Sequence, residues 1–135
     1  MKQPSYHQQH IADLDSQIIE KLRHGLPICT RPYWHVANEL ALGEMALILR
    51  IQHLSNEKRI RRYPPLREIK HLNLAEVMLT QWDKQLITLL RKGLPLTSRP
   101  FHVLAKQLDL SVDEVLFRSE RLRDTRYIGL IQPAV

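Results

Sequence analysis

The chain has 135 residues, of which 44% are hydrophobic and 25% charged, which suits one ordinary soluble domain or two very small ones. Its formal net charge of +6 and its pI near 9.8 fit an anionic partner, although many soluble proteins are mildly basic without one. No apolar run is long enough to span a membrane, and the polar start lacks the apolar stretch of a secretory signal. We therefore predict a cytoplasmic protein with no membrane partner, and the single Cys29 fits a reducing compartment.

An internal repeat dominates the sequence. Shifting the chain by 68 positions aligns residues 14–62 with residues 82–130 without a gap and gives 16 identities in 49 positions. The identical pairs include Asp15 with Asp83 and Arg50 with Arg118, as well as the glycine and prolines of a shared Gly-Leu-Pro string. Self-similarity of this kind indicates one structural unit present twice.

Each copy is predicted to contain three helices and a strand. In the first copy a helix ends before Gly25, and Pro32 stands at the first position of a second helix, where its missing N–H is tolerated. A tight turn at 41–43 leads to a third helix, and Arg59–Tyr63 has the pattern of a strand. This order is typical of a winged helix-turn-helix unit.

The second copy follows the same order. Thr80 is available as the cap of its first helix, Gly93 ends that helix, and Ser111 and Glu114 resemble a capping box at the start of the third. Tyr127–Ile131 is predicted to be the second wing strand. The predicted fold is mainly α, with tandem winged helix-turn-helix repeats and short β wings. We divide it into a polar tail at 1–11, repeat 1 at 12–65, a linker at 66–79 that contains a short packed helix, and repeat 2 at 80–135.

The third helix of each copy is the element that would read DNA. At about 100° per residue, its core face carries Leu47, Ile51 and Leu54 in the first copy, and Val115 and Leu122 in the second. The opposite face carries Met45, Leu49 and Gln52 in the first copy, and Asp113, Phe117 and Glu120 in the second. Base readers are usually Arg, Lys, Asn or Gln near the start of this helix, but the two starts carry acidic residues, Glu44 and the pair Asp113 and Glu114. We therefore interpret three outward residues as candidate protein contacts: Met45, Leu49 and Phe117.

The densest basic cluster lies in and around the first wing. Such a wing could contact a phosphate backbone without reading sequence, or it could be a strand edge that its charges keep soluble. Its candidate anion-binding or nucleic-acid-binding residues are Lys58, Arg59, Arg61, Arg62 and Arg67.

Catalytic chemistry is not indicated. The seven histidines form no recognised metal-binding spacing with Cys29 or with a carboxylate, and there is no glycine-rich phosphate loop or nucleophile motif. We predict no catalytic residue, no metal and no cofactor.

The connection between the first two helices carries a family resemblance. The string from Gly25 to Tyr33, repeated from Gly93 to Phe101, has the form Gly-Leu-Pro followed by Arg-Pro-aromatic. It resembles the N-terminal helix-turn-helix domain of siroheme decarboxylase subunits, which act in haem d1 and alternative haem biosynthesis. These subunits are relatives of the Lrp/AsnC regulators. In that family an α/β, ferredoxin-like domain follows the helix-turn-helix, builds the dimer and carries the tetrapyrrole site.

Here a second repeat takes the place of that α/β domain, and the sequence ends at Val135. The resemblance then implies a non-catalytic accessory or assembly component that acts through a protein partner or self-association. The alternative is an Lrp/AsnC-like DNA-binding transcriptional regulator that uses the basic wing. A third hypothesis is a tetrapyrrole-binding chain whose wing attracts ligand carboxylates.

Overall fold

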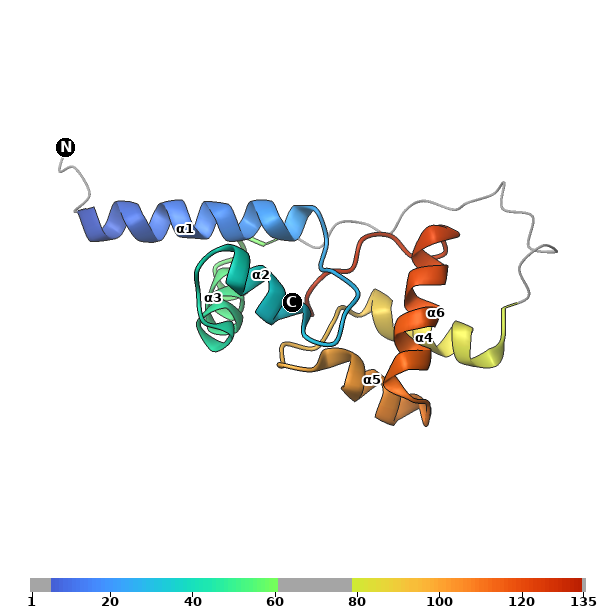
Figure 1. The fold of residues 1–135 in the computed structure, drawn as a ribbon. Coiled ribbons are helices and arrows are strands. Elements are labelled where there is room, and N and C mark those ends of the chain that lie inside the picture. Colours follow the sequence, from blue (N-terminus) through green and yellow to red (C-terminus); the bar gives the residue numbers. More distant parts are fainter. Residues whose placement is uncertain (1–5, 61–78, 135) are drawn as a thin grey trace.

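The computed structural model describes residues 6–60 and 79–134, with side chains from residue 13 onward. Repeat 1 contains α1 (Tyr6–Arg23), α2 (Pro32–Glu39) and α3 (Glu44–Asn56). Repeat 2 contains α4 (Gln81–Arg91), α5 (Pro100–Leu108) and α6 (Val112–Asp124). In Figure 1 the two sets of three helices lie side by side. None of the helices in the described residues is long and apolar enough to cross a membrane.

Local sequence signals set the helix boundaries as predicted. Gly25 and Gly93 follow the first helix of each repeat with φ angles of +86° and +99°, a conformation that a residue with a Cβ rarely adopts. Pro32 and Pro100 stand at the starts of α2 and α5. α1 begins at Tyr6, which is earlier than the apolar pattern predicts, so the segment taken as a polar tail includes helix.

The helix-turn-helix motif is present in both repeats. α2 and α3 are joined through Ala41 at φ +56°, and α5 and α6 through Asp109 at the same φ of +56°. The predicted core faces are confirmed, since Leu47, Ile51 and Leu54 of α3 are fully buried, as are Val115 and Leu122 of α6. The two turns share a positive φ at equivalent positions, and the third helices that follow bury equivalent faces.

The starts of the third helices differ in their caps. The Ser111 hydroxyl accepts a hydrogen bond from the Glu114 backbone N–H at 3.1 Å, whereas Gly43 of repeat 1 has no side chain to do this. Gly43 already has a φ of −73° and a ψ of 149°, and a Cβ there would meet nothing within 4 Å.

Gly43→Ser should therefore raise the free energy of unfolding by about 0.5–1 kcal/mol, through the added cap and the reduced freedom of the unfolded chain. Urea unfolding of the variant beside the parent protein measures this, and Ser111→Gly should give a loss of similar size as the reciprocal control. An unchanged or lowered stability of Gly43→Ser would show that the two turns are not equivalent.

The β wings are not formed in the described residues. Tyr127–Ile131 does not form the predicted strand, and the described sheet structure is a single parallel bridge between Leu94 and Pro133. Arg59 and Ile60 are not in a strand either, and the rest of the first wing, with the linker helix, lies outside the described residues. The second wing segment instead buries Ile128 and Ile131 in the core.

The C-terminal segment, residues 128–134, contacts the Gly-Leu-Pro connections of both repeats. The Leu26 N–H donates to the Ile131 carbonyl at 2.7 Å, and the Leu94 N–H donates to the Gln132 carbonyl at 2.7 Å. The Ala134 N–H returns a hydrogen bond to the Leu94 carbonyl at 2.8 Å. In Figure 1 the end of the chain accordingly lies between the two groups of helices.

A side-chain contact also crosses between the repeats. The buried Tyr33 hydroxyl of α2 donates to the Leu94 carbonyl at 2.8 Å, and burial raises the pKa of this tyrosine above its usual value. The equivalent residue in repeat 2 is Phe101, which has no hydroxyl. The buried apolar residues of both repeats form one continuous cluster, so the two copies share a core.

Candidate interaction surface

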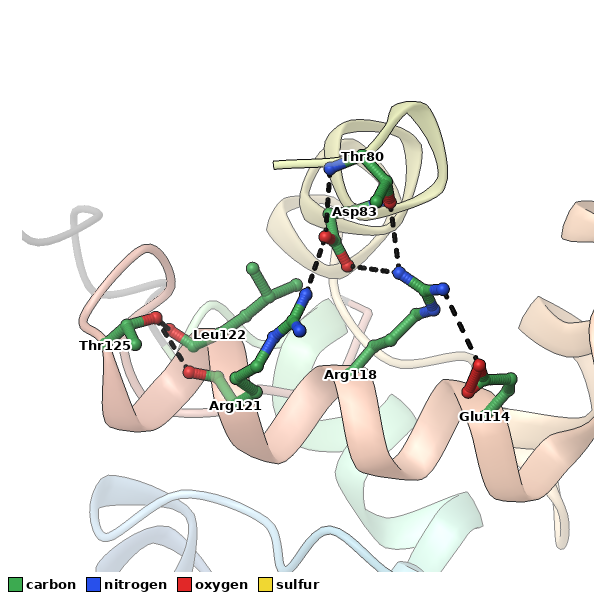
Figure 2. A network of polar contacts seen from close by, with 7 residues as sticks. All are labelled: Thr80, Asp83, Glu114, Arg118, Arg121, Leu122 and Thr125. Carbon is green, nitrogen blue, oxygen red and sulfur yellow. Dashed lines mark hydrogen bonds and ion pairs between the residues drawn. The ribbon is translucent and has the colours of Figure 1, made fainter. Parts of the chain in front are cut away.

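One buried aspartate in each repeat joins the first helix of that repeat to its third helix. Asp83 of α4 is fully buried, and its carboxylate accepts from Arg118 at 3.0 Å and from Arg121 at 2.8 Å, both on α6. Figure 2 shows both guanidinium groups directed at this carboxylate. Asp83 also accepts the Thr80 backbone N–H, while its own N–H donates to the Thr80 hydroxyl, which completes a capping box.

The equivalent carboxylate in repeat 1 has the same role. Asp15 of α1 is 1% exposed and accepts two hydrogen bonds of 2.5 Å from Arg50 of α3. Arg59 adds a third contact at 3.3 Å. The Arg50 Nε and Nη2 groups each donate to a different oxygen of the carboxylate, which is the bidentate geometry that arginine favours.

The pKa values follow from these contacts. The Arg50 hydrogen bonds are the largest cause of the lowered pKa of Asp15, opposed by burial and aided by the charges of Arg50 and Arg59. Burial would by itself raise the pKa of Asp83, but the Thr80 and Arg118 hydrogen bonds and the Arg121 charge bring it below its usual value. Both carboxylates are therefore ionised and paired with arginine, and these pairs join the third helix of each repeat to its first helix.

These clusters were not predicted from the sequence. The signal was present, because Asp15 with Asp83 and Arg50 with Arg118 are charged identities between the repeats. The second arginines could not be found in that way, since Arg59 and Arg121 do not occupy equivalent positions.

The outer faces of α3 and α6 carry the three residues predicted as protein contacts. Leu49 and Phe117 occupy equivalent positions in the repeat and are 57% and 62% exposed, and Met45 is 64% exposed. On α3 the stripe along the outer face consists of exposed Met45, Leu49, Gln52 and Asn56. On α6 the equivalent stripe consists of exposed Asp113, Phe117, Glu120 and Asp124.

Neither stripe contains a cation. Helix positions i, i+4, i+7 and i+11 lie within a narrow arc of the helix surface, and in a DNA-reading unit this arc of the third helix enters the major groove. The three carboxylates of the α6 stripe do not match a phosphate-lined groove. The Gln52 and Asn56 amides of the α3 stripe lie in the second half of α3, away from the helix start that usually reads bases. The exposed apolar side chains of the two stripes suit contact with the surface of another protein.

The basic wing candidates are placed only in part. Lys58 is exposed directly after α3, and Arg59 pairs with Asp15 at 3.3 Å and with Glu57 at 3.8 Å. Arg61, Arg62 and Arg67 lie outside the described residues. The charge of Arg59 is thus partly balanced by carboxylates of its own repeat.

Other exposed aromatic side chains have arginine neighbours. Trp34 of α2 lies under the Arg31 guanidinium, 5.5 Å from ring centre to charge, and Trp82 of α4 lies 5.9 Å from Arg118. The Trp82 side chain is 47% exposed. Among the described residues, no group of three His, Cys, Asp or Glu side chains is arranged to hold a metal ion.

The fold and its outer faces define a tandem helix-turn-helix protein, and comparison with known proteins gives its family. Residues 15–61 and residues 83–128 each match the family model described as the siroheme decarboxylase NirDL-like HTH domain. The chain therefore belongs to the siroheme decarboxylase NirDL-like HTH family, as the shared Gly-Leu-Pro connections predicted.

A curated relative supports this assignment. The chain is 37% identical over 63 residues to the siroheme decarboxylase NirG subunit of Stutzerimonas stutzeri. The matched segment covers 47% of this chain and 43% of the relative. The match thus spans less than half the length of that subunit.

Two solved structures share the fold. They are the siroheme decarboxylase NirDL and the same enzyme in co-complex with an iron-uroporphyrin III analogue, with a TM-score of 0.75 and 14% and 15% identity. Each match covers 88% of this chain and 64% or 65% of the other chain. Because either repeat alone is only about half of this sequence, the matched part of NirDL has the fold of both repeats. The sequence resemblance had led us to expect that a subunit of this family contains one helix-turn-helix unit followed by an α/β domain.

Proposed function

We propose that this chain is a non-catalytic accessory or assembly component that works beside a siroheme decarboxylase and binds its partner through the outer faces of α3 and α6. The observation that carries the proposal is the exposed apolar pair Leu49 and Phe117. They stand at equivalent positions, at the place where a helix-turn-helix would otherwise contact DNA. Membership of the siroheme decarboxylase family supports the choice of partner, because a relative is named as a subunit of that enzyme.

The role of the buried ionisable groups also supports a non-catalytic function. Asp15 and Asp83 are the buried carboxylates of the described residues, and arginines neutralise both. A catalytic acid or base needs a pKa near the working pH and access to the substrate. These two carboxylates have neither property.

Co-purification tests the proposal. The tagged chain would be co-expressed with the siroheme decarboxylase subunits of the same organism, and the complex analysed by size-exclusion chromatography with light scattering. We expect a defined complex that the double variant Leu49→Asp/Phe117→Asp loses, with at least about a tenfold drop in affinity, since central apolar anchors dominate interfaces. Val103→Asp, on the 37% exposed Val103 of α5, is the matched control and should leave the complex intact. A chain that forms neither this complex nor a self-assembly would contradict the proposal.

The alternative of a DNA-binding regulator rests on Lys58 and the basic wing residues that follow it. A gel shift on duplex DNA at low salt separates the two functions, because contacts to phosphate weaken steeply as salt rises. The proposal expects no shift, and a salt-dependent shift that Lys58→Ala weakens would support the regulator instead. An absorbance titration with sirohaem tests the tetrapyrrole hypothesis in the same way, and we expect it to be flat.

A further inference from the structure

The outer stripes of α3 and α6 occupy equivalent positions in the repeat but differ in charge. Gln52 of α3 is matched by Glu120 of α6, and Asn56 is matched by Asp124, so at two positions an amide in repeat 1 is the isosteric carboxylate in repeat 2. The third difference is Met45 against Asp113. All of these side chains are exposed. The two helices therefore present different chemistry at equivalent places.

The carboxylates of the α6 stripe are largely unneutralised. Arg118 and Arg121 are turned toward Asp83, at 3.0 and 2.8 Å, as Figure 2 shows, and Arg118 also contacts Glu114 at 3.6 Å. Arg123 lies 3.8 Å from Asp124, whose side chain stays 70% exposed. Within the described part of the chain, Asp113 and Glu120 have no ion-pair partner. Arg118 and Arg121 thus serve the inner side of α6, and the stripe on its outer side is acidic on a chain of net charge +6.

The acidic stripe restricts what can cover Phe117. A phosphate backbone or an anionic membrane surface would be repelled by the three carboxylates. A symmetric contact of α6 with α6 of a second copy would bring six carboxylates together, which like-charge repulsion disfavours. A protein segment with an apolar anchor for Phe117 and flanking Lys or Arg side chains would satisfy both the apolar and the acidic groups.

We propose that the outer face of α6, formed by Asp113, Phe117, Glu120 and Asp124, is the docking site for a cationic, apolar-anchored segment of a partner protein. The uncharged face of α3 does not bind that segment, so the two repeats have different roles. The inference rests on the proposed function, in which both outer faces contact the partner, and adds to it the chemistry of the segment that docks on α6.

A defined peptide tests the site on the full chain. The probe is a synthetic amphipathic helix of leucine and lysine, and its counterpart of leucine and glutamate is the control. Nitrogen-15 NMR titration should place the shifts on α6 around Phe117 and not on α3, although the protein as a whole is basic and repels a cation. Binding should weaken as salt rises. Shifts on α3, scattered shifts or no binding at low salt would overturn the proposal.

The repeat itself supplies the matched variants. Glu120→Gln/Asp124→Asn gives α6 the amides of α3 with almost no change of shape, and it should weaken the peptide by about tenfold at low salt. Gln52→Glu/Asn56→Asp should create a second, weaker site on α3. Circular dichroism confirms that each variant is folded, which is expected for exposed substitutions.

The outcomes separate this inference from the proposed function. A siroheme decarboxylase complex that is lost in the Phe117 variant but not in Glu120→Gln/Asp124→Asn would keep the accessory role and overturn the cationic partner. Self-association that is lost in Glu120→Gln/Asp124→Asn would assign the face to a second copy and also overturn the inference. No complex at all, together with α6-specific peptide binding, would contradict the proposed partner but support the site.

Discussion

Asp83→Ala should lower the free energy of unfolding by about 3 kcal/mol or more. The substitution leaves Arg118, whose side chain is 16% exposed, without its buried partner, and removing one member of a buried ion pair costs about 3–5 kcal/mol. It also removes the carboxylate half of the capping box at Thr80, which adds to the loss. Urea unfolding followed by circular dichroism measures the difference.

A double-mutant cycle isolates the pair. Arg118→Leu in the Asp83→Ala background should restore part of the stability, because the unpaired charge is removed along with its partner. Asp113→Asn, on an exposed carboxylate of α6, is the control and should change stability by less than about 0.5 kcal/mol. If Asp83→Ala behaved like that control, the Asp83 cluster would not hold α6 against α4.

The pH dependence gives the sign of the same interaction. The pKa of Asp83 is lower in the folded chain than its usual value, so the stability from this carboxylate is fully present above about pH 4, the unfolded pKa. It is lost as the pH falls through the folded pKa. The gap in stability between the parent protein and Asp83→Asn should therefore be widest near neutral pH and close in acid. A gap that stayed constant in acid would contradict the charge-based account.

Gly93→Ala should lower the stability more than the same substitution at Gly25 or Gly43. A Cβ at this position would lie 2.5 Å from the Ala134 Cα and 2.8 Å from the Pro133 carbonyl oxygen, and both contacts are with backbone. The φ of +99° adds strain for any residue with a side chain. We expect a loss of about 2–4 kcal/mol, since a steric conflict adds to the cost of about 1–2 kcal/mol for the backbone conformation.

The other glycines provide graded controls. Gly25→Ala meets the Leu130 side chain at 3.0 Å at a φ of +86°, and a side chain can move more easily than backbone, so its loss should be smaller. Gly43→Ala meets nothing and should change stability least. Hydrogen exchange of the Leu26 and Leu94 amides, which donate to the C-terminal segment, should accelerate most in Gly93→Ala. Equal losses at Gly93 and Gly43 would show that the C-terminal segment is not packed as described.

The sequence by itself determined the repeat, the mainly helical class, the helix boundaries other than the start of α1, and the outward position of Leu49 and Phe117. Glycine at positive φ, proline at the first helical position and serine or threonine at an N-cap act through neighbouring backbone atoms, so their meaning does not depend on distant residues. The period of the apolar residues then gives the buried face of each third helix.

The tertiary structure decided which arginines pair with the two buried aspartates and which backbone groups the second wing segment bonds to. Asp15 and Arg50 are 35 positions apart, and a sequence gives no distance between such groups before the helices pack. The pattern of Tyr127–Ile131 suits a strand, but a strand also needs a partner along its edge. Ile131 and the residues after it bond instead to the connections at Leu26 and Leu94. The N–H groups of these connections and the shared core lie between the two repeats.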